Sequence, residues 1–240
     1  MTSLTTCADA ETAAKRAAGE IARRLQAARR ERGGAHLALS GGTTPARTYE
    51  LLSAELQDWQ AIDVWFADER CVGPDDDESN YKLARETLLD AAAGLEPARV
   101  HRMHGELGPE EGAASYAAEL REHAPIEDAL AVLDVIALGI GPDGHIASLF
   151  PGAPTLQAGE HELCLGVHDS PKPPPERITL SLAVLRAARR CVLLATGSSK
   201  ADAVSAMLDE PSPHVPASLL RRARLSVIVD DAAGPPPLHR

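Results

Sequence analysis

Short apolar runs recur along this chain and alternate with longer segments that are expected to be helical. The runs are rich in β-branched and aliphatic residues, which is typical of strands buried inside a parallel sheet. They cover residues 36–40, 64–67, 133–138, 190–196 and 225–229. The expected helices cover residues 9–31, 109–122 and 201–208. This alternation predicts an α/β fold: a single three-layer domain with a mostly parallel, Rossmann-like sheet flanked by helices.

The length of the chain, 240 residues, allows either one large domain or two small ones. No linker or internal repeat divides it, so we expect one domain over residues 1–231. Residues 232–240 contain the sequence Gly-Pro-Pro-Pro and are predicted to form a disordered tail.

The net charge of −11 argues against binding to a nucleic-acid backbone, which requires a basic face. An anionic substrate would therefore have to be bound by a local cluster of cations. No run approaches 18 apolar residues, and the N-terminus lacks the apolar segment of a signal peptide. We expect a soluble, cytoplasmic protein without a membrane or nucleic-acid partner. The four cysteines form no CxxC pair, which disfavours a zinc site or a disulfide framework.

A glycine-rich loop follows the apolar run 133–138 and reads Gly-Ile-Gly-Pro-Asp-Gly-His over residues 139–145. In open α/β sheets, ligands bind just beyond the carboxyl ends of the strands. The loop carries Asp143 and His145, and a histidine beside a carboxylate is a candidate general base near neutral pH. The alternative is a polar turn with a solvated histidine.

A second glycine-rich turn, Ser-Gly-Gly-Thr-Thr-Pro over residues 40–45, joins the run 36–40 to a helix. We expect Thr44 to cap this helix and Pro45 to take its first position. Unpaired N–H groups at the start of a helix favour an anion, and Ser40 and Thr43 add hydroxyl donors. A purely structural turn is the alternative.

Charged residues stand at the ends of three further strands. Asp68-Glu69-Arg70 follow the run 64–67 and either form a solvated turn or reach the same crevice. Arg177 follows the stiff proline-rich loop 171–175 and opens a strand over 177–180, where it could bind phosphate or make a surface ion pair. Lys200 opens the helix 201–208, with Ser198 or Ser199 as its cap. A lysine there opposes the helix dipole, which favours an anion at this place.

Other polar groups receive structural interpretations. Ser79 or Asn80 is expected to cap a helix, and the acidic run 75–78 before it to form an exposed loop. His101 and His104 have no accompanying ligand cluster, so we expect surface histidines and no metal site.

The segment GIGPDGHIASLFPG, residues 139–152, resembles the signature of the 6-phosphogluconolactonases, which share their fold with the glucosamine-6-phosphate deaminase/isomerases. Further matching segments follow the family's order, and the resemblance spans roughly residues 10–230. They are residues 39–45, 65–70, 79–81, 177–180 and 197–200.

The resemblance implies an enzyme, a lactone (carboxylic ester) hydrolase that converts 6-phospho-D-glucono-1,5-lactone to 6-phospho-D-gluconate in the oxidative pentose phosphate pathway. His145, supported by Asp143, would activate water. Arg70 would be a cation near the lactone's carboxyl group, where it could stabilise the oxyanion, or near the phosphate. Asp68 matches an aspartate that handles protons in the related isomerases. The substrate's phosphate would be held by Ser40, Gly41, Gly42, Thr43, Arg177 and Lys200. The resemblance implies no metal, no organic cofactor and no obligate protein partner.

Two alternatives belong to other functional classes. In the amino-sugar-phosphate isomerase/deaminase pattern, a glutamate follows the loop histidine by five residues, but Phe150 stands there in this chain, which favours the lactonase. A non-catalytic sugar-phosphate sensor usually carries a DNA-binding module, and the sequence contains no basic helix-turn-helix pattern. Ser148 lacks the GxSxG context of a serine hydrolase.

Overall fold

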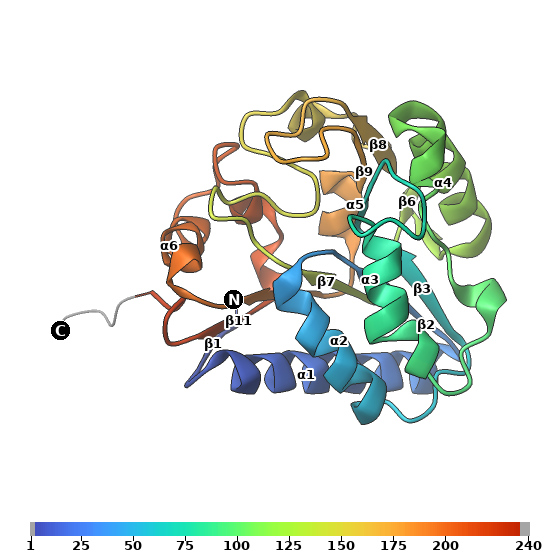
Figure 1. The fold of residues 1–240 in the computed structure, drawn as a ribbon, viewed down its shortest axis with the longest axis horizontal. Helices are drawn as coiled ribbons and strands as arrows, with labels where there is room; N and C mark the ends of the chain where they lie inside the picture. The colour runs from blue at the N-terminus through green and yellow to red at the C-terminus, as the bar shows by residue number, and fades with distance from the viewer. Residues whose placement is uncertain (1–2, 236–240) are drawn as a thin grey trace.

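The computed structural model describes residues 3–235 and is built around a six-stranded parallel sheet (Figure 1). Its strand order is β1-β11-β10-β7-β2-β3. These strands are β1 (Ser3–Cys7), β2 (Ala35–Leu39), β3 (Ile62–Phe66), β7 (Val135–Leu138), β10 (Cys191–Ala195) and β11 (Leu225–Asp230). Every neighbouring pair is parallel, so the predicted fold class is confirmed.

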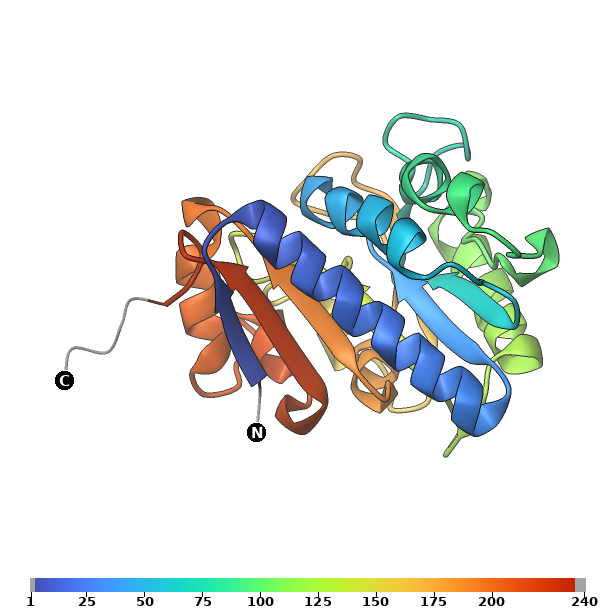
Figure 2. The ribbon, with the colours of Figure 1, turned by 90° about the horizontal axis from the view of Figure 1, so that it is seen from below.

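Helices cover both faces of this sheet. They are α1 (Ala10–Arg32), α2 (Thr43–Glu55), α3 (Asn80–Thr87), α4 (Pro109–His123), α5 (Leu182–Ala187) and α6 (Ala201–Leu208). Figure 1 shows α1 and α2 on one side of the sheet and α4, α5 and α6 on the other. Figure 2 shows α1 lying across the strands. No helix within residues 3–235 is long and apolar enough to cross a membrane.

The alanine-rich composition of α1 explains its close packing on the sheet. Its buried face consists mainly of alanines, with Ile21 and Leu25 supplying bulk. Asp9 caps the helix by accepting a hydrogen bond from Thr12 N at 2.7 Å, and Gly33 ends it with a φ of 79°, in the left-handed region. The helix predicted over 9–31 is therefore confirmed.

A second, three-stranded sheet, β4-β9-β8, was not predicted. It consists of β4 (Asp68–Arg70), β9 (Arg177–Leu180) and β8 (Cys164–Val167), and both of its pairings are antiparallel. The pairing places Asp68 opposite Thr179 and Arg70 opposite Arg177. The stretch 68–70 is therefore neither a solvated turn nor a free loop but a short strand. A further hairpin joins β5 (Ile126–Glu127) to β6 (Leu130–Ala131).

Both ends of the described chain lie along β11. The strand β1 pairs with it from Ser3 to Cys7, although the sequence of β1 contains no apolar run. At the other end, Ala233 is buried and its N–H donates to Asp230. Residues 236–240 of the predicted tail lie outside the described residues.

His101 is buried, which contradicts the predicted surface position. Its side chain is 5% exposed and stacks on Trp65, with 3.8 Å between the ring centroids. Its Nδ1 lies 2.8 Å from Glu119 Oε1, and its Nε2 lies 3.0 Å from Asp63 Oδ1. An isolated bridge between Val64 and Val100 draws this segment against the sheet, which a spacing argument could not anticipate. His104 lies at the surface, with 40% of its side chain exposed, as predicted.

Candidate active site

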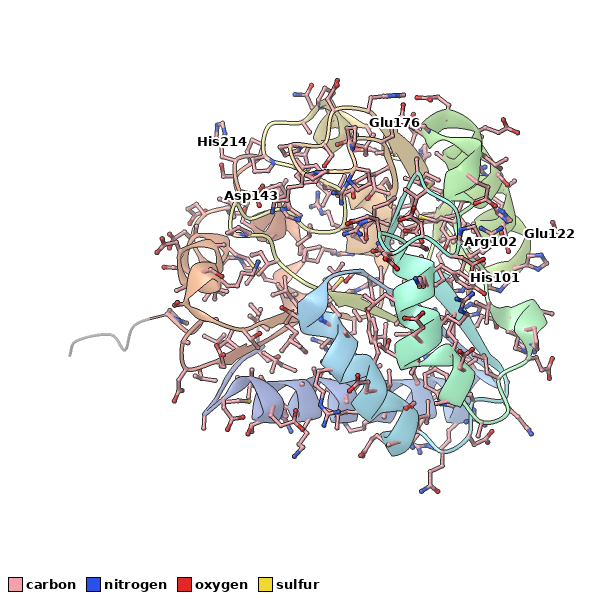
Figure 3. The ribbon with its side chains drawn as sticks, viewed as in Figure 1. His101, Arg102, Glu122, Asp143, Glu176 and His214 are labelled. Atoms are coloured by element: carbon pink, nitrogen blue, oxygen red, sulfur yellow. The ribbon has the colours of Figure 1, made fainter. Side chains whose placement is uncertain are left out.

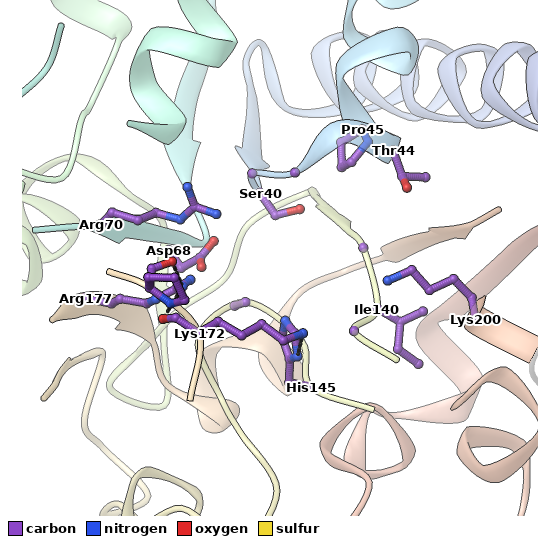
Figure 4. Close-up of a pocket in the computed structure, with 16 residues that line it drawn as sticks. Ser40, Thr44, Pro45, Asp68, Arg70, Ile140, His145, Lys172, Arg177 and Lys200 are labelled. Atoms are coloured by element: carbon purple, nitrogen blue, oxygen red, sulfur yellow. Dashed lines mark hydrogen bonds between the residues drawn. The ribbon is translucent and has the colours of Figure 1, made fainter. Parts of the chain in front are cut away.

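The candidate site lies where the strand order of the main sheet reverses. From β2 the chain continues through α2 to β3, on one side of the β2–β7 pair, whereas β10 lies on the other side. Loops that follow two such strands diverge and leave a crevice between them. A cleft of about 280 Å3 opens there (Figure 4).

The cleft brings together most of the site residues predicted from the sequence. Its lining includes Ser40, Gly41, Gly42, Asp68, Arg70, His145, Arg177 and Lys200. Asp143 contacts His145 through its carboxylate, and Thr43 follows Gly42 as the first residue of α2. Figure 4 shows Asp68, Arg70 and Arg177 on one side, Lys200 with Thr44 on the other, and His145 between them.

Asp143 and His145 form a hydrogen-bonded pair, with 2.5 Å between Asp143 Oδ1 and His145 Nδ1. Gly141 makes room for this pair. A Cβ atom at Gly141 would lie 2.0 Å from His145 Nδ1 and 2.4 Å from Asp143 Oδ1. The loop also closes on itself, because Gly141 N donates to the His145 carbonyl at 2.9 Å.

The surroundings of the pair favour a neutral imidazole. Burial lowers the pKa of His145, the Asp143 carboxylate opposes that effect in part, and the net pKa is below the ordinary value. For Asp143, burial raises the pKa, but the contact with His145 outweighs it and the net pKa is lowered. An ionised Asp143 accepts a hydrogen bond from the Nδ1–H group of His145, so the free lone pair of the neutral ring is on Nε2. That is the state a general base requires.

Phe150 supplies an apolar wall beside the pair. Its ring centroid lies 4.7 Å from that of His145, and the Arg177 guanidinium lies 5.7 Å from the Phe150 ring. Phe150 is buried and carries no group that could exchange a proton.

The turn after β2 presents an unused hydroxyl at the cleft. Tyr49 Oη donates to the Ser40 carbonyl at 2.7 Å and accepts from Ser40 N at 2.9 Å, which fixes the backbone of the turn. Ser40 Oγ is buried and has no hydrogen-bond partner among the described residues. A buried hydroxyl without a partner is costly, so a ligand atom is expected to satisfy it.

The predicted capping of α2 was wrong. The helix begins at Thr43, not after Thr44, and Gly42 precedes it with a φ of 108° and no side-chain cap. A φ of 108° is readily adopted only by glycine, and glycine has no side chain that could accept hydrogen bonds from the first N–H groups of the helix. These groups and the helix dipole favour an anion at this end of the cleft.

Asp68 is buried and held from two sides. Its Oδ2 accepts from Ser148 Oγ at 2.7 Å, and its Oδ1 accepts from Asn80 Nδ2 at 3.2 Å. Ser148 is therefore engaged with a carboxylate and is fully buried, consistent with its rejection as a nucleophile. The sequence did not indicate that Asn80 and Ser148 would hold Asp68, because both contacts join distant segments.

Glu69 faces away from the chemistry and anchors α3. Its two oxygens accept from the N–H groups of Arg70, Asn80 and Tyr81 and from Ser79 Oγ. Burial raises the pKa of Glu69 to about 6, so the carboxylate is charged at neutral pH. Ser79 in turn accepts from Lys82 N at 3.2 Å, which confirms the predicted serine cap.

The arginines of the cleft are partly engaged with the protein. Arg70 Nη1 donates to the Glu78 carbonyl at 2.6 Å. Arg177 is buried, with 4% of its surface exposed, so the alternative of a surface ion pair is wrong. Its Nε and Nη2 donate to backbone carbonyls of residues 172–174, which leaves Nη1 for a ligand.

Lys200 enters the cleft from the turn after β10. The predicted serine cap of α6 was wrong, because Ser198–Lys200 form a 3-10 turn and Lys200 itself precedes the helix with no side-chain cap. Burial and the neighbouring Lys172 lower the pKa of Lys200.

Lys172 was missed by the sequence reasoning. It lines the cleft, and its Nζ lies 3.7 Å from Asp143 Oδ1 and 3.4 Å from His145 Nδ1. The available signal was its rarity: it is one of four lysines, and it stands in the stiff loop before Arg177. Within residues 3–235, no group of three or more metal-ligating side chains is placed to hold a metal ion.

Comparison with known proteins assigns the chain to a family. The family model described as glucosamine-6-phosphate isomerases/6-phosphogluconolactonase matches residues 8–229. The 6-phosphogluconolactonase of Streptomyces coelicolor is 40% identical over 238 residues, which cover 94% of this chain and 90% of the relative. The human 6-phosphogluconolactonase is 39% identical over 208 residues, covering 82% of this chain and 78% of the relative.

A solved structure agrees with this assignment. The crystal structure of a 6-phosphogluconolactonase from Shewanella baltica superposes with a TM-score of 0.84 and 30% identity, covering 96% of this chain and 98% of that one. The chain therefore belongs to the glucosamine-6-phosphate isomerase/6-phosphogluconolactonase family.

Proposed function

We propose that this protein hydrolyses 6-phospho-D-glucono-1,5-lactone to 6-phospho-D-gluconate in the oxidative pentose phosphate pathway. The observation that carries the proposal is the Asp143–His145 pair, which lies in a cation-lined cleft with Phe150 against the imidazole. The pair provides a base for water. Phe150 stands where the isomerase pattern has a proton-carrying glutamate, so the site lacks that second proton carrier. The names of the similar proteins support the same substrate.

Binding of the phosphate would orient the lactone ring. The proposed phosphate donors are the Ser40 hydroxyl, the backbone N–H groups of residues 40–43, the Lys200 ammonium group and Arg177 Nη1. Anchoring the ring against His145 converts attack by water into an effectively intramolecular step.

The reaction then needs one proton carrier. His145 Nε2 takes a proton from water as the water oxygen attacks C1, and Arg70 stabilises the negative charge that develops on the carbonyl oxygen. Collapse of this adduct breaks the bond between C1 and the ring oxygen, and His145 returns the proton to that oxygen. The lactone is an activated ester, so no covalent enzyme intermediate is required.

The test uses lactone freshly made by glucose-6-phosphate dehydrogenase, with a correction for spontaneous hydrolysis. Purified protein should accelerate lactone disappearance without added metal and in the presence of EDTA. It should release no ammonia from glucosamine 6-phosphate. Failure to accelerate hydrolysis, or deamination at comparable efficiency, would overturn the proposal. The same proposal places the protein in the cytoplasm, acting without an obligate protein partner.

A further inference from the structure

In the loop of residues 170–175, hydrogen bonds fix the backbone of Lys172. Ser170 Oγ accepts from Lys172 N at 3.2 Å and donates to the Lys172 carbonyl at 2.8 Å, so it fixes both backbone groups of the lysine. Ser170 N donates to the Pro175 carbonyl at 3.0 Å and closes the loop. The prolines on the C-terminal side of Lys172 restrict the chain further.

Arg177 also fixes this loop, through hydrogen bonds to its backbone carbonyls. Its Nη2 donates to the carbonyls of Lys172 at 3.0 Å and of Pro173 at 3.1 Å, and its Nε donates to that of Pro174 at 3.1 Å. A buried guanidinium that binds three successive carbonyls leaves the loop little freedom.

The end of the lysine side chain reaches the Asp143–His145 pair. Lys172 Nζ lies 3.7 Å from Asp143 Oδ1 and 3.4 Å from His145 Nδ1, while 40% of the side chain remains exposed. Neither contact serves the folding of the loop, which is already fixed through its backbone.

We propose that Lys172 is a positioning residue for the Asp143–His145 pair and that Ser170 and Arg177 fix the loop in order to deliver it. This inference deepens the proposed function and rests on it. The ammonium group would orient the carboxylate of Asp143 and oppose the build-up of positive charge on the imidazole.

The charges around His145 explain why such a cation is useful. Asp143 and Asp68 both favour the protonated imidazole, whereas burial and Lys172 oppose it. Arg70, Arg177 and Lys200 line the same cleft. With Lys172 present, His145 is free to accept a proton from water. After protonation, the neighbouring ammonium favours return of that proton to the leaving oxygen.

The direct test is an NMR titration of the His145 ring in the absence of substrate, with its signal assigned by its loss in His145→Gln. Lys172→Met should move the titration of His145 to higher pH, and Lys172→Arg should restore most of the wild-type titration. Lys82→Met removes a partly exposed lysine that pairs with Asp77 and does not line the cleft, so it should change nothing. Ser170→Ala, which loosens the loop without removing the charge, should shift the titration in the same direction as Lys172→Met but by less.

Kinetics then separate positioning from substrate binding. In Lys172→Met the acidic limb of the kcat profile should move to higher pH together with the NMR titration. A raised KM with an unchanged His145 titration would overturn the inference and make Lys172 a substrate ligand. The titration needs no substrate, so its outcome does not depend on lactonase activity. Lactonase activity itself is tested with the wild-type protein alone.

Discussion

His145 combines a largely buried ring, with 17% of its side chain exposed, with a carboxylate on one nitrogen, and this combination decides which proton it can move. Asp143 Oδ1 lies 2.5 Å from Nδ1, so the second nitrogen is left for a substrate or for water. Burial keeps the ring neutral at a pH where an exposed histidine would already be partly charged.

Replacing His145 by alanine should lower kcat on the order of 10²- to 10⁴-fold, the usual contribution of general acid–base catalysis. KM should change little, because the phosphate ligands lie elsewhere. In the wild type, kcat should fall as the pH drops through the pKa of His145, which lies below the usual value. Steady-state kinetics across pH, with folding checked by circular dichroism, would measure both effects. Wild-type turnover by a folded His145→Ala protein would exclude this role.

Lys200 is the residue on which phosphate recognition is most simply tested. Lys200→Ala should weaken binding of the phosphorylated lactone by about 1.5–3 kcal/mol, the range for a hydrogen bond to a charged group. Turnover of unphosphorylated gluconolactone should hardly change. Lys82→Ala provides the matched control, since Lys82 pairs with Asp77 on the surface. Equal losses with both lactones would show that Lys200 supports the site's structure and not the phosphate.

At this scale, the sequence predicted best the positions of titratable residues in the loops that follow strands. Asp143, His145 and Lys200 are of this kind. Lys172, Asn80 and Ser148 were missed because their roles arise from contacts with distant segments. His101 was misplaced for the same reason, since its partners Asp63 and Glu119 come from β3 and α4.

Among the elements, the loop after β7 depends most directly on a glycine, because Gly141 leaves room for the side chains of His145 and Asp143. Gly141→Ala would place a Cβ atom 2.0 Å from His145 Nδ1, so the ring and Asp143 would have to move. We expect kcat to fall nearly as far as in His145→Ala, with little loss of stability. At Gly139 a Cβ atom would meet only Pro45 Cγ at 4.0 Å, so Gly139→Ala should cost much less turnover. Similar activity in the two variants would contradict the packing argument.

The contact between β3 and α4 should respond to pH through His101. Figure 3 places this residue on the far side of the molecule from Asp143. Burial lowers the pKa of His101, but the carboxylates of Asp63 and Glu119 outweigh it and the net pKa is raised. His36, Arg99 and His123 are the other charged or titratable groups nearby.

A raised pKa means that the protonated ring stabilises the folded state. The contribution is complete below the unfolded pKa of about 6.5 and is lost as the pH rises through the higher folded value. The difference in the free energy of unfolding between wild type and His101→Gln should therefore be larger at about pH 6 than at about pH 9. Urea unfolding at the two pH values would measure it. A difference independent of pH would indicate that the ring acts only by packing on Trp65.

Whole elements were predicted where their pattern was strong and missed where pairing alone created them. The strand runs of the main sheet and helices α1 and α4 follow from periodicity. By contrast, β4 consists only of Asp68, Glu69 and Arg70, which have ionisable side chains. It is a strand because it pairs with β9. β1 is an edge strand that pairs with β11, and most of its residues are exposed, so its sequence lacks the apolar run by which a strand is detected.

For the molecule as a whole, the site couples distant parts of the chain. The residues that line the cleft follow β2, β3, β7 and β10 or lie on β9. Binding of a ligand should therefore stabilise the whole domain. Calorimetry should show one unfolding transition, as expected for a single domain over residues 1–231. Added 6-phosphogluconate should raise the free energy of unfolding by about 2.7 kcal/mol at a hundred times its Kd. Two transitions, only one of which responded to the ligand, would contradict a single domain.

The cleft gathers Arg70, Lys172, Arg177 and Lys200 on a molecule whose net charge is −11. At an ionic strength of about 0.01 M, charges act over about 30 Å, so an approaching phosphorylated sugar is first repelled by the molecule as a whole. At about 0.15 M the reach falls to about 8 Å, and the substrate responds mainly to the cations at the cleft mouth. Moderate salt should therefore speed capture of the substrate before higher salt slows it.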